Sequence, residues 1–297
     1  MTSCGHTTSS SGARCSAEWC WRRPRQLRQN EWNLTVNATS RLQLIADRVT
    51  SALTPVMREL RITEDELHAA GDFLDRVGQA GMCKSLLDIA FAMTAIDTRR
   101  HGIPGTRTNL EGPVYRPGAP TRATNNLIER DLSPDADLLV LSGQVTDAVT
   151  GRPMSGVELD FWHADEHGRY DYDGNHLRGV VHSGQDGRYR VDTIMPVDYA
   201  EHLNDPIGEL LAMLDRDGYR AAHIHLKVRV RGVERLTTQL FRGDSPHLDQ
   251  DYVIGAVSED LVVEPRLVGT VDGHRQYAMS FDIAVPPLPA DHLVEGS

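Results

Sequence analysis

"LLVLSGQVTDAVTGRPMSGVELDFWHA", residues 138–164, is the stretch that decides the fold class. Apolar and polar residues alternate along it, and a turn with Gly151 and Pro153 divides it into two halves. Alternation with a period of two is typical of strands that bury one face. The stretch therefore predicts two β-strands joined by a turn.

The segments that follow repeat this pattern. Short alternating runs separated by Gly and Asp turns are "GRYRVDTIMP" (187–196), "AHIHLKVRVRG" (222–232), "ERLTTQLFRG" (234–243), "EDLVVEPRLVG" (259–269) and "HRQYAMSFDIAV" (274–285). Only "PIGELLAMLDRDG" (206–218) breaks the series, with a helical pattern. Repeated short strands with turn signals between them favour an antiparallel β-sandwich or barrel. We predict a mainly β protein built around an antiparallel β-sandwich.

The segment before the strands has a helical period. From about Thr39 to Arg100 apolar residues recur at spacings of three and four, beginning with Leu42, Leu44, Ile45, Val49, Leu53 and Val56. Pro55 predicts a kink or a break in the first helix. Thr63 and Glu66 form a capping box for a second helix, which Gly78 or Gly81 would end.

A third helix is predicted in "CKSLLDIAFAMTAID", residues 83–97. It is apolar nearly all round, which favours burial against the rest of the chain or a second copy. The next stretch, residues 101–127, is rich in Gly, Pro and Thr and predicts a long ordered loop.

Composition excludes several classes of partner and location. The chain has 297 residues and a formal net charge of −11, which argues against a nucleic-acid-binding surface. No apolar run approaches the roughly 18 residues that span a bilayer, so no membrane segment is expected. Residues 1–36 lack the apolar core of a signal peptide and predict a disordered extension. Its three cysteines match no paired zinc pattern. We expect a cytoplasmic protein.

"RAAHIHLKVRV", residues 220–230, carries the first sign of chemistry. Residues two apart on a strand point to one face, so His223 and His225 would look the same way. Paired neutral imidazoles suit a metal ion, although two satisfied polar side chains on an edge strand are the simpler alternative. No cysteine lies in the β region, which excludes a thiolate site there.

Two kinds of oxygen ligand could complete such a site. Carboxylates are available at Asp160, Asp165, Glu166 and Asp192, and they would favour non-haem Fe(II). Tyrosines stand at positions 170, 172, 189 and 199. A phenolate, with an ordinary pKa of about 10, needs a strongly charged Lewis acid to form at neutral pH, and so favours Fe(III).

Five motifs, in order, resemble those of intradiol ring-cleaving dioxygenases. They are "EGPVYRPGAP" (111–120), "SGQVTDAVTGRPMSGVELDFWHADEHGRYDY" (142–172), "GRYRVDTIMPVDY" (187–199), "RAAHIHLKV" (220–228) and "LTTQLF" (236–241). The resemblance runs from about residue 40 to 285 and is greatest to the catechol 1,2-dioxygenase and hydroxyquinol 1,2-dioxygenase branch. It implies one Fe(III) per chain.

The resemblance also assigns the iron ligands. They are Tyr170, Tyr199, His223 and His225. Tyr172 is the local alternative to Tyr170, which we prefer because Gly168 precedes it by two as in the family motif. Tyr189 is predicted to be a core strand residue.

Further roles follow from the same resemblance. Arg220 would lie at the substrate ring and stabilise developing negative charge, and Tyr199 would accept a substrate proton. Gln239 matches a glutamine near the iron. The expected pocket wall consists of Leu110, Pro113 and Val114 from the loop and Ala92 and Ala95 from the third helix.

The implied reaction is the cleavage of catechol with O2 to cis,cis-muconate in the degradation of aromatic compounds. Hydroxyquinol or a substituted catechol is the alternative substrate, giving maleylacetate or a substituted muconate, and a non-catalytic β-sandwich binding module is the alternative of another class. The resemblance implies a helical dimerisation and linker domain at 37–110, a β-sandwich catalytic domain at 111–297 and a homodimer. The dimer helices are a candidate phospholipid site.

Overall fold

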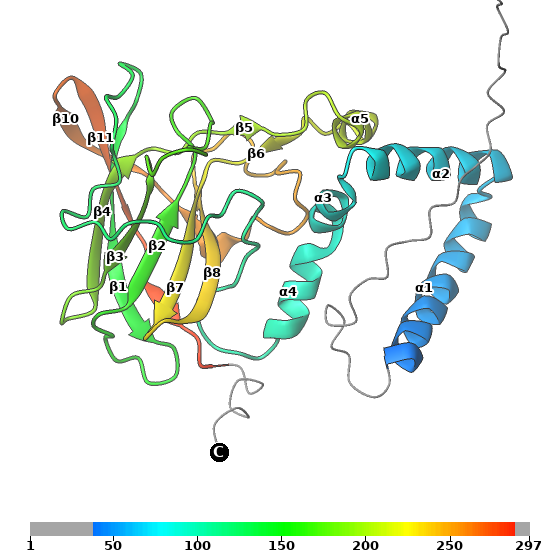
Figure 1. The fold of residues 1–297 in the computed structure, drawn as a ribbon, viewed down its shortest axis with the longest axis horizontal. Helices are drawn as coiled ribbons and strands as arrows, with labels where there is room; N and C mark the ends of the chain where they lie inside the picture. Colours follow the sequence, from blue (N-terminus) through cyan, green and yellow to red (C-terminus); the bar gives the residue numbers. More distant parts are fainter. Residues whose placement is uncertain (1–37, 289–297) are drawn as a thin grey trace, which may run out of the picture. The chain divides into compact units, whose positions relative to one another are not determined.

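The computed structural model describes residues 38–288 and divides the chain into two compact units, Met1–Leu67 and His68–Ser297 (Figure 1). The predicted extension at 1–36 lies outside the described residues. The division at residues 110 and 111 stays a prediction. No helix among residues 38–288 is long and apolar enough to cross a membrane.

The first helix, α1, runs from Ala38 to Leu60 without interruption. Of the kink or break predicted at Pro55, the break is wrong, since this residue lies inside the helix, and the kink stays a prediction. A proline removes one backbone donor, and the turns on either side can hold the helix together across that loss. Most apolar side chains of α1 are exposed, including Leu42, Val49 and Leu53.

The capping box of the second helix, α2 (Glu64–Gln79), is confirmed. The backbone N–H of Thr63 donates to Glu66 Oε2 at 2.8 Å, and the N–H of Glu66 donates to Thr63 Oγ1 at 3.3 Å. Each side chain thus satisfies a backbone donor that the first turn leaves free. After α2 the chain turns at Gly81, whose φ of 72° suits a residue without a Cβ atom.

The predicted third helix is one helical stretch with a wider turn in its middle. It comprises α3 (Cys83–Leu87), a π-helical turn η2 (Asp88–Ala92) and α4 (Met93–Arg100). Ile89 and Met93 are buried against Ile207 and Phe241. Phe91 and Leu87 are exposed, so the stretch packs on the rest of the chain along one face only.

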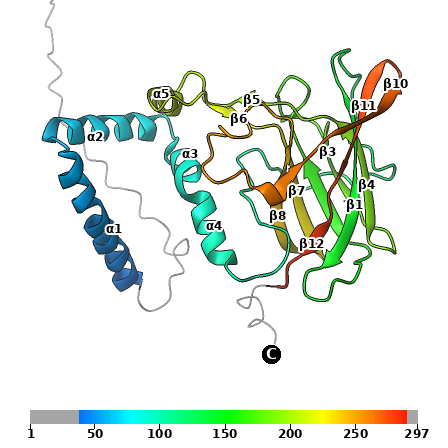
Figure 2. The ribbon, with the colours of Figure 1, turned by 180° about the vertical axis from the view of Figure 1, so that it is seen from behind.

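Two five-stranded sheets form most of the remaining structure (Figures 1 and 2). The first contains β1 (Leu138–Asp147), β4 (Arg188–Ile194), β10 (Arg266–Val271), β11 (His274–Ser280) and β12 (Ile283–Val285). The second has the order β3 (Arg178–His182), β2 (Glu158–Trp162), β7 (His223–Val230), β8 (Val233–Arg242) and β9 (Val262–Val263). A short pair, β5 (Tyr199–Ala200) and β6 (Tyr219–Arg220), helix α5 (Pro206–Met213) and the turn η3 (Glu259–Leu261) complete the described elements.

The prediction of a mainly β sandwich is confirmed, but the sheets are mixed rather than antiparallel. Strand β1 pairs in parallel with β11 and β12, and β8 pairs in parallel with β9. Periodicity identifies which residues share a face and carries no information on the direction of a partner strand. The antiparallel pairs of consecutive strands, such as β7 with β8 and β10 with β11, are the ones that sequence order can suggest.

The core lies between the two sheets. Leu141 of β1 and Val191 of β4 pack with Leu159 of β2 and Leu226 of β7 in one apolar cluster. Within the first sheet, Gly143 of β1 lies against the link between β11 and β12, where a Cβ atom would be 1.8 Å from the carbonyl oxygen of Phe281. The sheets therefore meet through interlocking apolar faces, as in a sandwich.

We expect Leu226→Ala to lower the free energy of unfolding by about 2–5 kcal/mol, because it leaves a cavity in the middle of this cluster. Leu267→Ala on β10 is the matched control, since that side chain is exposed. Its effect should stay within about 0.5 kcal/mol. Chemical denaturation followed by circular dichroism measures both, and equal losses would contradict the placement of the core.

Candidate metal centre and active site

Strand β7 presents two histidines on the face opposite to the sandwich core. Ile224 and Leu226 belong to the core cluster, whereas His223 and His225 point to the other face. Both imidazoles are buried. In the register of the sheet, His225 lies beside Gln239 of β8 and Trp162 of β2. The face alternation predicted from "HIH" is thus present, and neither histidine faces solvent.

Two tyrosines from separate segments of the chain meet these histidines. Tyr170 follows β2, and Tyr199 begins β5, where it pairs with Arg220 of β6. The Nε2 atoms of His223 and His225 are 3.1 Å apart, and His225 Nε2 is 3.2 Å from the Tyr170 hydroxyl. The hydroxyls of Tyr170 and Tyr199 are also 3.2 Å apart. Four donor atoms from three parts of the chain therefore converge on one point.

Gly168 makes this convergence possible. Its φ is 74°, and a Cβ atom there would lie 2.6 Å from Cβ of Tyr199. Any side chain at this position would add backbone strain and push the two tyrosine loops apart. The glycine that suggested Tyr170 in the sequence therefore has a direct steric role between the tyrosines.

The structure separates Tyr170 from its sequence neighbour. Tyr170 is 9% exposed and lies among the converging donors, whereas Tyr172 is 63% exposed. The loop does not continue the strand alternation, so the two side chains do not share a face. Tyr189 packs in the sandwich core and donates a hydrogen bond to the carbonyl oxygen of Phe281 at 2.7 Å.

Burial keeps both histidines neutral. It lowers the pKa of His223 well below its ordinary value, with a further contribution from the charge of Arg220. Burial and then His223 lower the pKa of His225 in the same direction. The carbonyl of Ala221 accepts the Nδ1–H of His223 at 2.6 Å, which leaves the Nε2 lone pair facing the other donors. Neutral imidazoles with free lone pairs are what metal ligation requires.

The same burial disfavours the phenolates. It raises the pKa of Tyr170 well above its usual range, and the neighbouring Tyr199 adds to the rise. For Tyr199, burial raises the pKa to about 12 even though Arg220 opposes it. Ionised phenols at this point therefore need a compensating cation of high charge.

The donor set fits a ferric ion better than it fits the Fe(II) site with carboxylate ligands that the sequence also allows. Two phenol oxygens and two imidazole nitrogens converge, and no group of three or more His, Cys, Asp or Glu residues among positions 38–288 is arranged to hold a metal. The candidate carboxylates of the Fe(II) alternative are engaged elsewhere: Asp160 accepts from Tyr115, and Asp192 from Arg190. Tyr170, Tyr199, His223 and His225 are thus the residues that would hold Fe(III).

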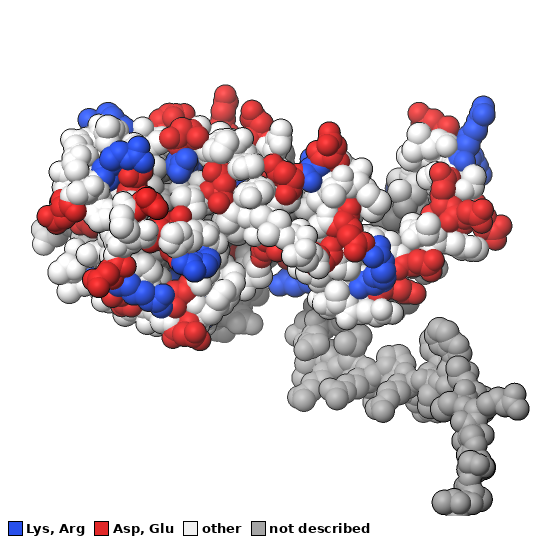
Figure 3. Space-filling model, turned by 90° about the horizontal axis from the view of Figure 1, so that it is seen from above, with Lys and Arg blue, Asp and Glu red and all other residues white. Residues whose placement is uncertain are grey.

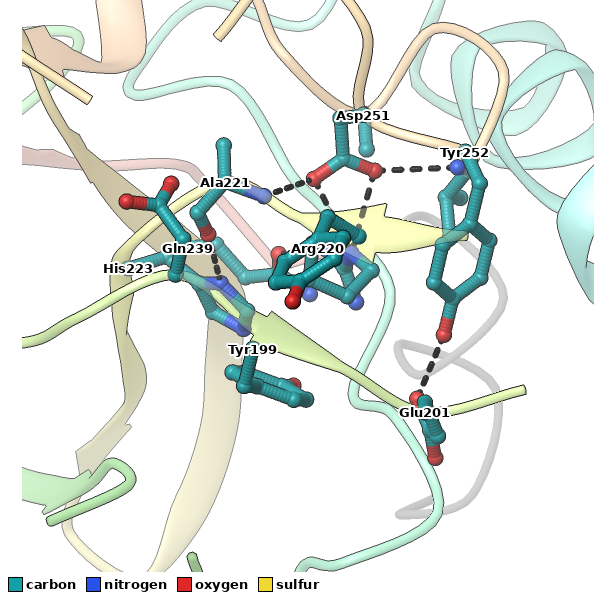
Figure 4. A network of polar contacts seen from close by, with 12 residues as sticks. Tyr199, Glu201, Arg220, Ala221, His223, Gln239, Asp251 and Tyr252 are labelled. Atoms are coloured by element: carbon teal, nitrogen blue, oxygen red, sulfur yellow. Dashed lines mark hydrogen bonds and ion pairs between the residues drawn. The ribbon is translucent and has the colours of Figure 1, made fainter. Parts of the chain in front are cut away.

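Arg220 lies beside the donors and is held by a buried carboxylate (Figure 4). Its Nε is 3.0 Å from both oxygens of Asp251, which also accepts the N–H of Ala221 at 3.0 Å. Burial lowers the pKa of Arg220, but the charge of Asp251 outweighs it and the net shift is upward. Arg220 therefore remains a cation, and Asp251 is a positioning residue that sequence reasoning missed.

Gln239 joins this arginine to the loop before the sheets. Arg220 Nη2 donates to Gln239 Oε1 at 2.8 Å, and Gln239 Nε2 donates to the carbonyl of Leu110 at 2.9 Å. The loop continues to Gly112, where a Cβ atom would lie 3.3 Å from Cε1 of His225. The glutamine thus fixes the distance between the arginine and the loop that covers the histidines.

A cavity of about 520 Å³ opens beside Arg220. Four of the five predicted wall residues line it, namely Leu110, Pro113, Ala92 and Ala95. The fifth, Val114, lies instead in a small cluster with Trp162 and Tyr170, because its side chain turns from the cavity toward β2. The volume is sufficient for a single aromatic ring with a substituent.

Sequence reasoning missed the polar part of this lining. Glu201, His202 and Tyr252 border the cavity, and the Tyr252 hydroxyl donates to Glu201 Oε2 at 2.5 Å. Nothing in the local pattern of "DQDYV" distinguishes Tyr252 from any other loop tyrosine. Its partner stands 51 positions earlier in the chain, and only the fold brings the two together.

We expect Gly168→Ala to lower iron binding because the added methyl displaces Tyr199. Gly151→Ala is the matched control: its φ of 68° imposes similar strain, about 1–2 kcal/mol, but nothing lies within 4 Å of the added Cβ. Two measurements report the difference. One is the iron content after reconstitution, and the other is the visible charge-transfer band that Fe(III) bound to the two phenolates would give. Equal iron content in the two variants would contradict the steric role.

Known proteins are similar to this chain in sequence and in fold. The sequence profile of the family described as "Dioxygenase" (Dioxygenase_C) matches residues 110–287. Over 269 residues the chain is 31% identical to a catechol 1,2-dioxygenase of Acinetobacter baylyi, covering 84% of this chain and 86% of that protein. Its fold is similar to that of a 3-chlorocatechol 1,2-dioxygenase of Rhodococcus opacus, with a TM-score of 0.76 at 27% identity over 84% of this chain and 99% of the other. A hydroxyquinol 1,2-dioxygenase structure from Pseudomonas putida gives a TM-score of 0.70 at 28% identity, over 83% and 92%. The chain belongs to the intradiol ring-cleaving dioxygenases.

Proposed function

We propose that this chain is a non-haem Fe(III) enzyme that cleaves catechol between its two hydroxyl-bearing carbons with O2, giving cis,cis-muconate. The observation that carries the proposal is the convergence of the donor atoms of Tyr170, Tyr199, His223 and His225. Arg220 lies next to them, and the adjoining cavity has room for one ring. A non-catalytic binding module would not need two buried tyrosines and two neutral histidines at one point.

Bound Fe(III) would supply a Lewis acid that draws electron density from the catechol ring and so activates it toward O2. Tyr199 would accept a proton from a catechol hydroxyl, since the charge of Arg220 favours its ionised form. Arg220, held by Asp251, would stabilise the negative charge that develops on the ring. Gln239 would keep the arginine and the covering loop in place.

Hydroxyquinol is the second candidate substrate, giving maleylacetate, and substituted catechols are a third, giving substituted muconates. The similar proteins act on catechol, chlorocatechol and hydroxyquinol by their names, at about 30% identity. The polar part of the cavity, with Glu201 and Tyr252, favours a polar ring over a chlorinated one.

The surface supports small molecules as the partners. On the face shown in Figure 3, acidic and basic side chains are intermixed, and no continuous basic patch is present. A nucleic acid would need such a patch. We propose that the protein acts in the cytoplasm on a catechol-type substrate and O2, in the degradation of aromatic compounds.

We expect Tyr170→Phe and Tyr199→Phe to lose most of the visible absorption of the iron-loaded protein and to reduce turnover by about 100-fold or more. Tyr172→Phe should behave as the parent, because that side chain is exposed. Absorption spectra with and without anaerobic catechol, together with oxygen uptake, measure both effects. Full absorption and activity in Tyr170→Phe would remove this residue from the ligand set.

The helical part supports a homodimer. The exposed apolar residues of α1 recur at spacings of three and four: Leu42, Ile45, Val49, Leu53, Val56 and Leu60. Such a stripe is typical of a helix that packs on a partner, and we propose that the partner is a second copy of the chain. A phospholipid at the dimer helices stays a further prediction, which mass spectrometry of an organic extract of the pure protein tests.

We expect Leu53→Glu to convert the dimer to a monomer, because it places a charge in the apolar stripe. Val149→Glu is the control: it adds the same charge at an exposed position in the turn after β1. Light scattering coupled to size exclusion gives both masses. A parent protein that is monomeric at micromolar concentration would already contradict the proposal.

A further inference from the structure

Glu201 and Tyr252 form a polar pair on the wall of the cavity beside the proposed active site. The Tyr252 hydroxyl donates to Glu201 Oε2 at 2.5 Å, and the opposite end of the hydrogen-bond network holds Arg220 (Figure 4). The Arg220 guanidinium carbon lies 5.8 Å from the centre of the Tyr252 ring. Tyr252 thus contacts Arg220 through its ring and Glu201 through its hydroxyl, and all three residues border the same cavity.

The pair is held in place from several sides. Backbone N–H of Tyr252 donates to the carbonyl of Tyr219 at 3.3 Å, and its ring meets the edge of His202 at 5.4 Å between centres. His202 Nδ1 is hydrogen-bonded at 2.8 Å to Oδ2 of Asp205, which is the N-cap residue of α5. Tyr252 is 2% exposed, whereas Glu201 is exposed at the edge of the cavity. A fixed phenol thus orients a carboxylate that remains open to an entering molecule.

The residues that line the cavity carry more negative than positive charge. Four carboxylates line it: Asp88, Glu111, Glu201 and Glu234. Lys227 does not line the cavity, but its ammonium group forms ion pairs with both Glu111 and Glu234. The two cations of the lining are Arg220, which forms an ion pair with the buried Asp251, and the exposed Lys84. In the described part of the chain, no ion pair joins Lys84 to Glu201.

We propose that Glu201, oriented by Tyr252, selects catechols that carry a neutral or cationic hydrogen-bond-donating substituent, such as a hydroxyl or an amine, over those that carry an apolar or anionic group. This inference rests on the proposed function, because it requires the catechol oxygens to occupy the metal centre beside Arg220. The free lone pairs of the carboxylate accept the substituent's O–H or N–H. A methyl group offers no donor, and a carboxylate meets like charge.

The test is a panel of catechols that differ only in one ring substituent. For the parent protein we expect kcat/KM for hydroxyquinol to exceed that for 4-methylcatechol by about tenfold, and 3,4-dihydroxybenzoate to be the poorest substrate. In Glu201→Leu the hydroxyl preference should vanish. In Glu201→Gln, which keeps an acceptor and loses the charge, 3,4-dihydroxybenzoate should improve while much of the hydroxyl preference remains. Anaerobic titration of the visible band gives the binding constants of the same catechols, independent of turnover, and these should show the same order of preference.

Two matched substitutions separate a local effect from a general one. Asp88→Asn removes one negative charge from the same lining, and Glu259→Gln removes one from an exposed turn outside it. Neither should change the hydroxyl-to-methyl ratio. A shift in Asp88→Asn as large as that in Glu201→Leu would overturn the assignment to Glu201.

The two proposals fail in different ways. Normal visible absorption and cleavage of unsubstituted catechol, with an unchanged substituent ratio in both Glu201 variants, would overturn this inference and leave the proposed function intact. Absence of the visible band and of any cleavage in the iron-loaded parent would overturn the proposed function itself. Tyr252→Phe is a second test of the inference, because it removes only the phenol hydroxyl that orients Glu201. It should reduce the preference for a hydroxyl-bearing catechol by several-fold.

Discussion

The rest of the structure depends on strand β7, which must be buried on both faces for different reasons. One face, with Ile224 and Leu226, fills the space between the sheets. The other presents His223 and His225 to tyrosines that come from distant loops. Because successive side chains alternate, a slip of one residue in register would exchange the two sets and abolish both the core and the proposed metal site. The pairings of β7 with β2 and β8 fix that register on both sides.

This constraint also explains which features could be predicted from sequence. The alternation in "HIHLKV" is local, and the structure places His223 and His225 on one face as it indicates. The preference for Tyr170 over Tyr172 rests instead on the family motif, and the structure buries Tyr170 beside His225. The capping box at Thr63 and Glu66 is local as well. The strand alternation and the capping box depend on neighbours within a few residues, whereas Gly168 is also required by its close approach to Tyr199.

The features that were missed depend on long-range partners. Asp251 holds Arg220 across 31 positions, and Tyr252 meets Glu201 across 51, so no window of sequence contains either pair. The parallel direction of β11 and β12 against β1 is a property of the connections rather than of any strand. The wider helical turn at residues 88–92 is a further example: the cavity it borders is formed by loops from later in the chain.

The position of Glu201 at the edge of the cavity has an energetic consequence. Arg220 and Asp251 are both buried, so their desolvation is already compensated by mutual pairing before any substrate enters. Glu201 is exposed, and in the free protein water satisfies the lone pairs that Tyr252 leaves open. That water is displaced only when a ring occupies the cavity, and a donor on the ring then replaces it whereas a methyl group cannot. Discrimination of this kind arises at the moment of binding and costs the folded protein little stability, which is why a charged residue can stand in the wall of a largely apolar pocket.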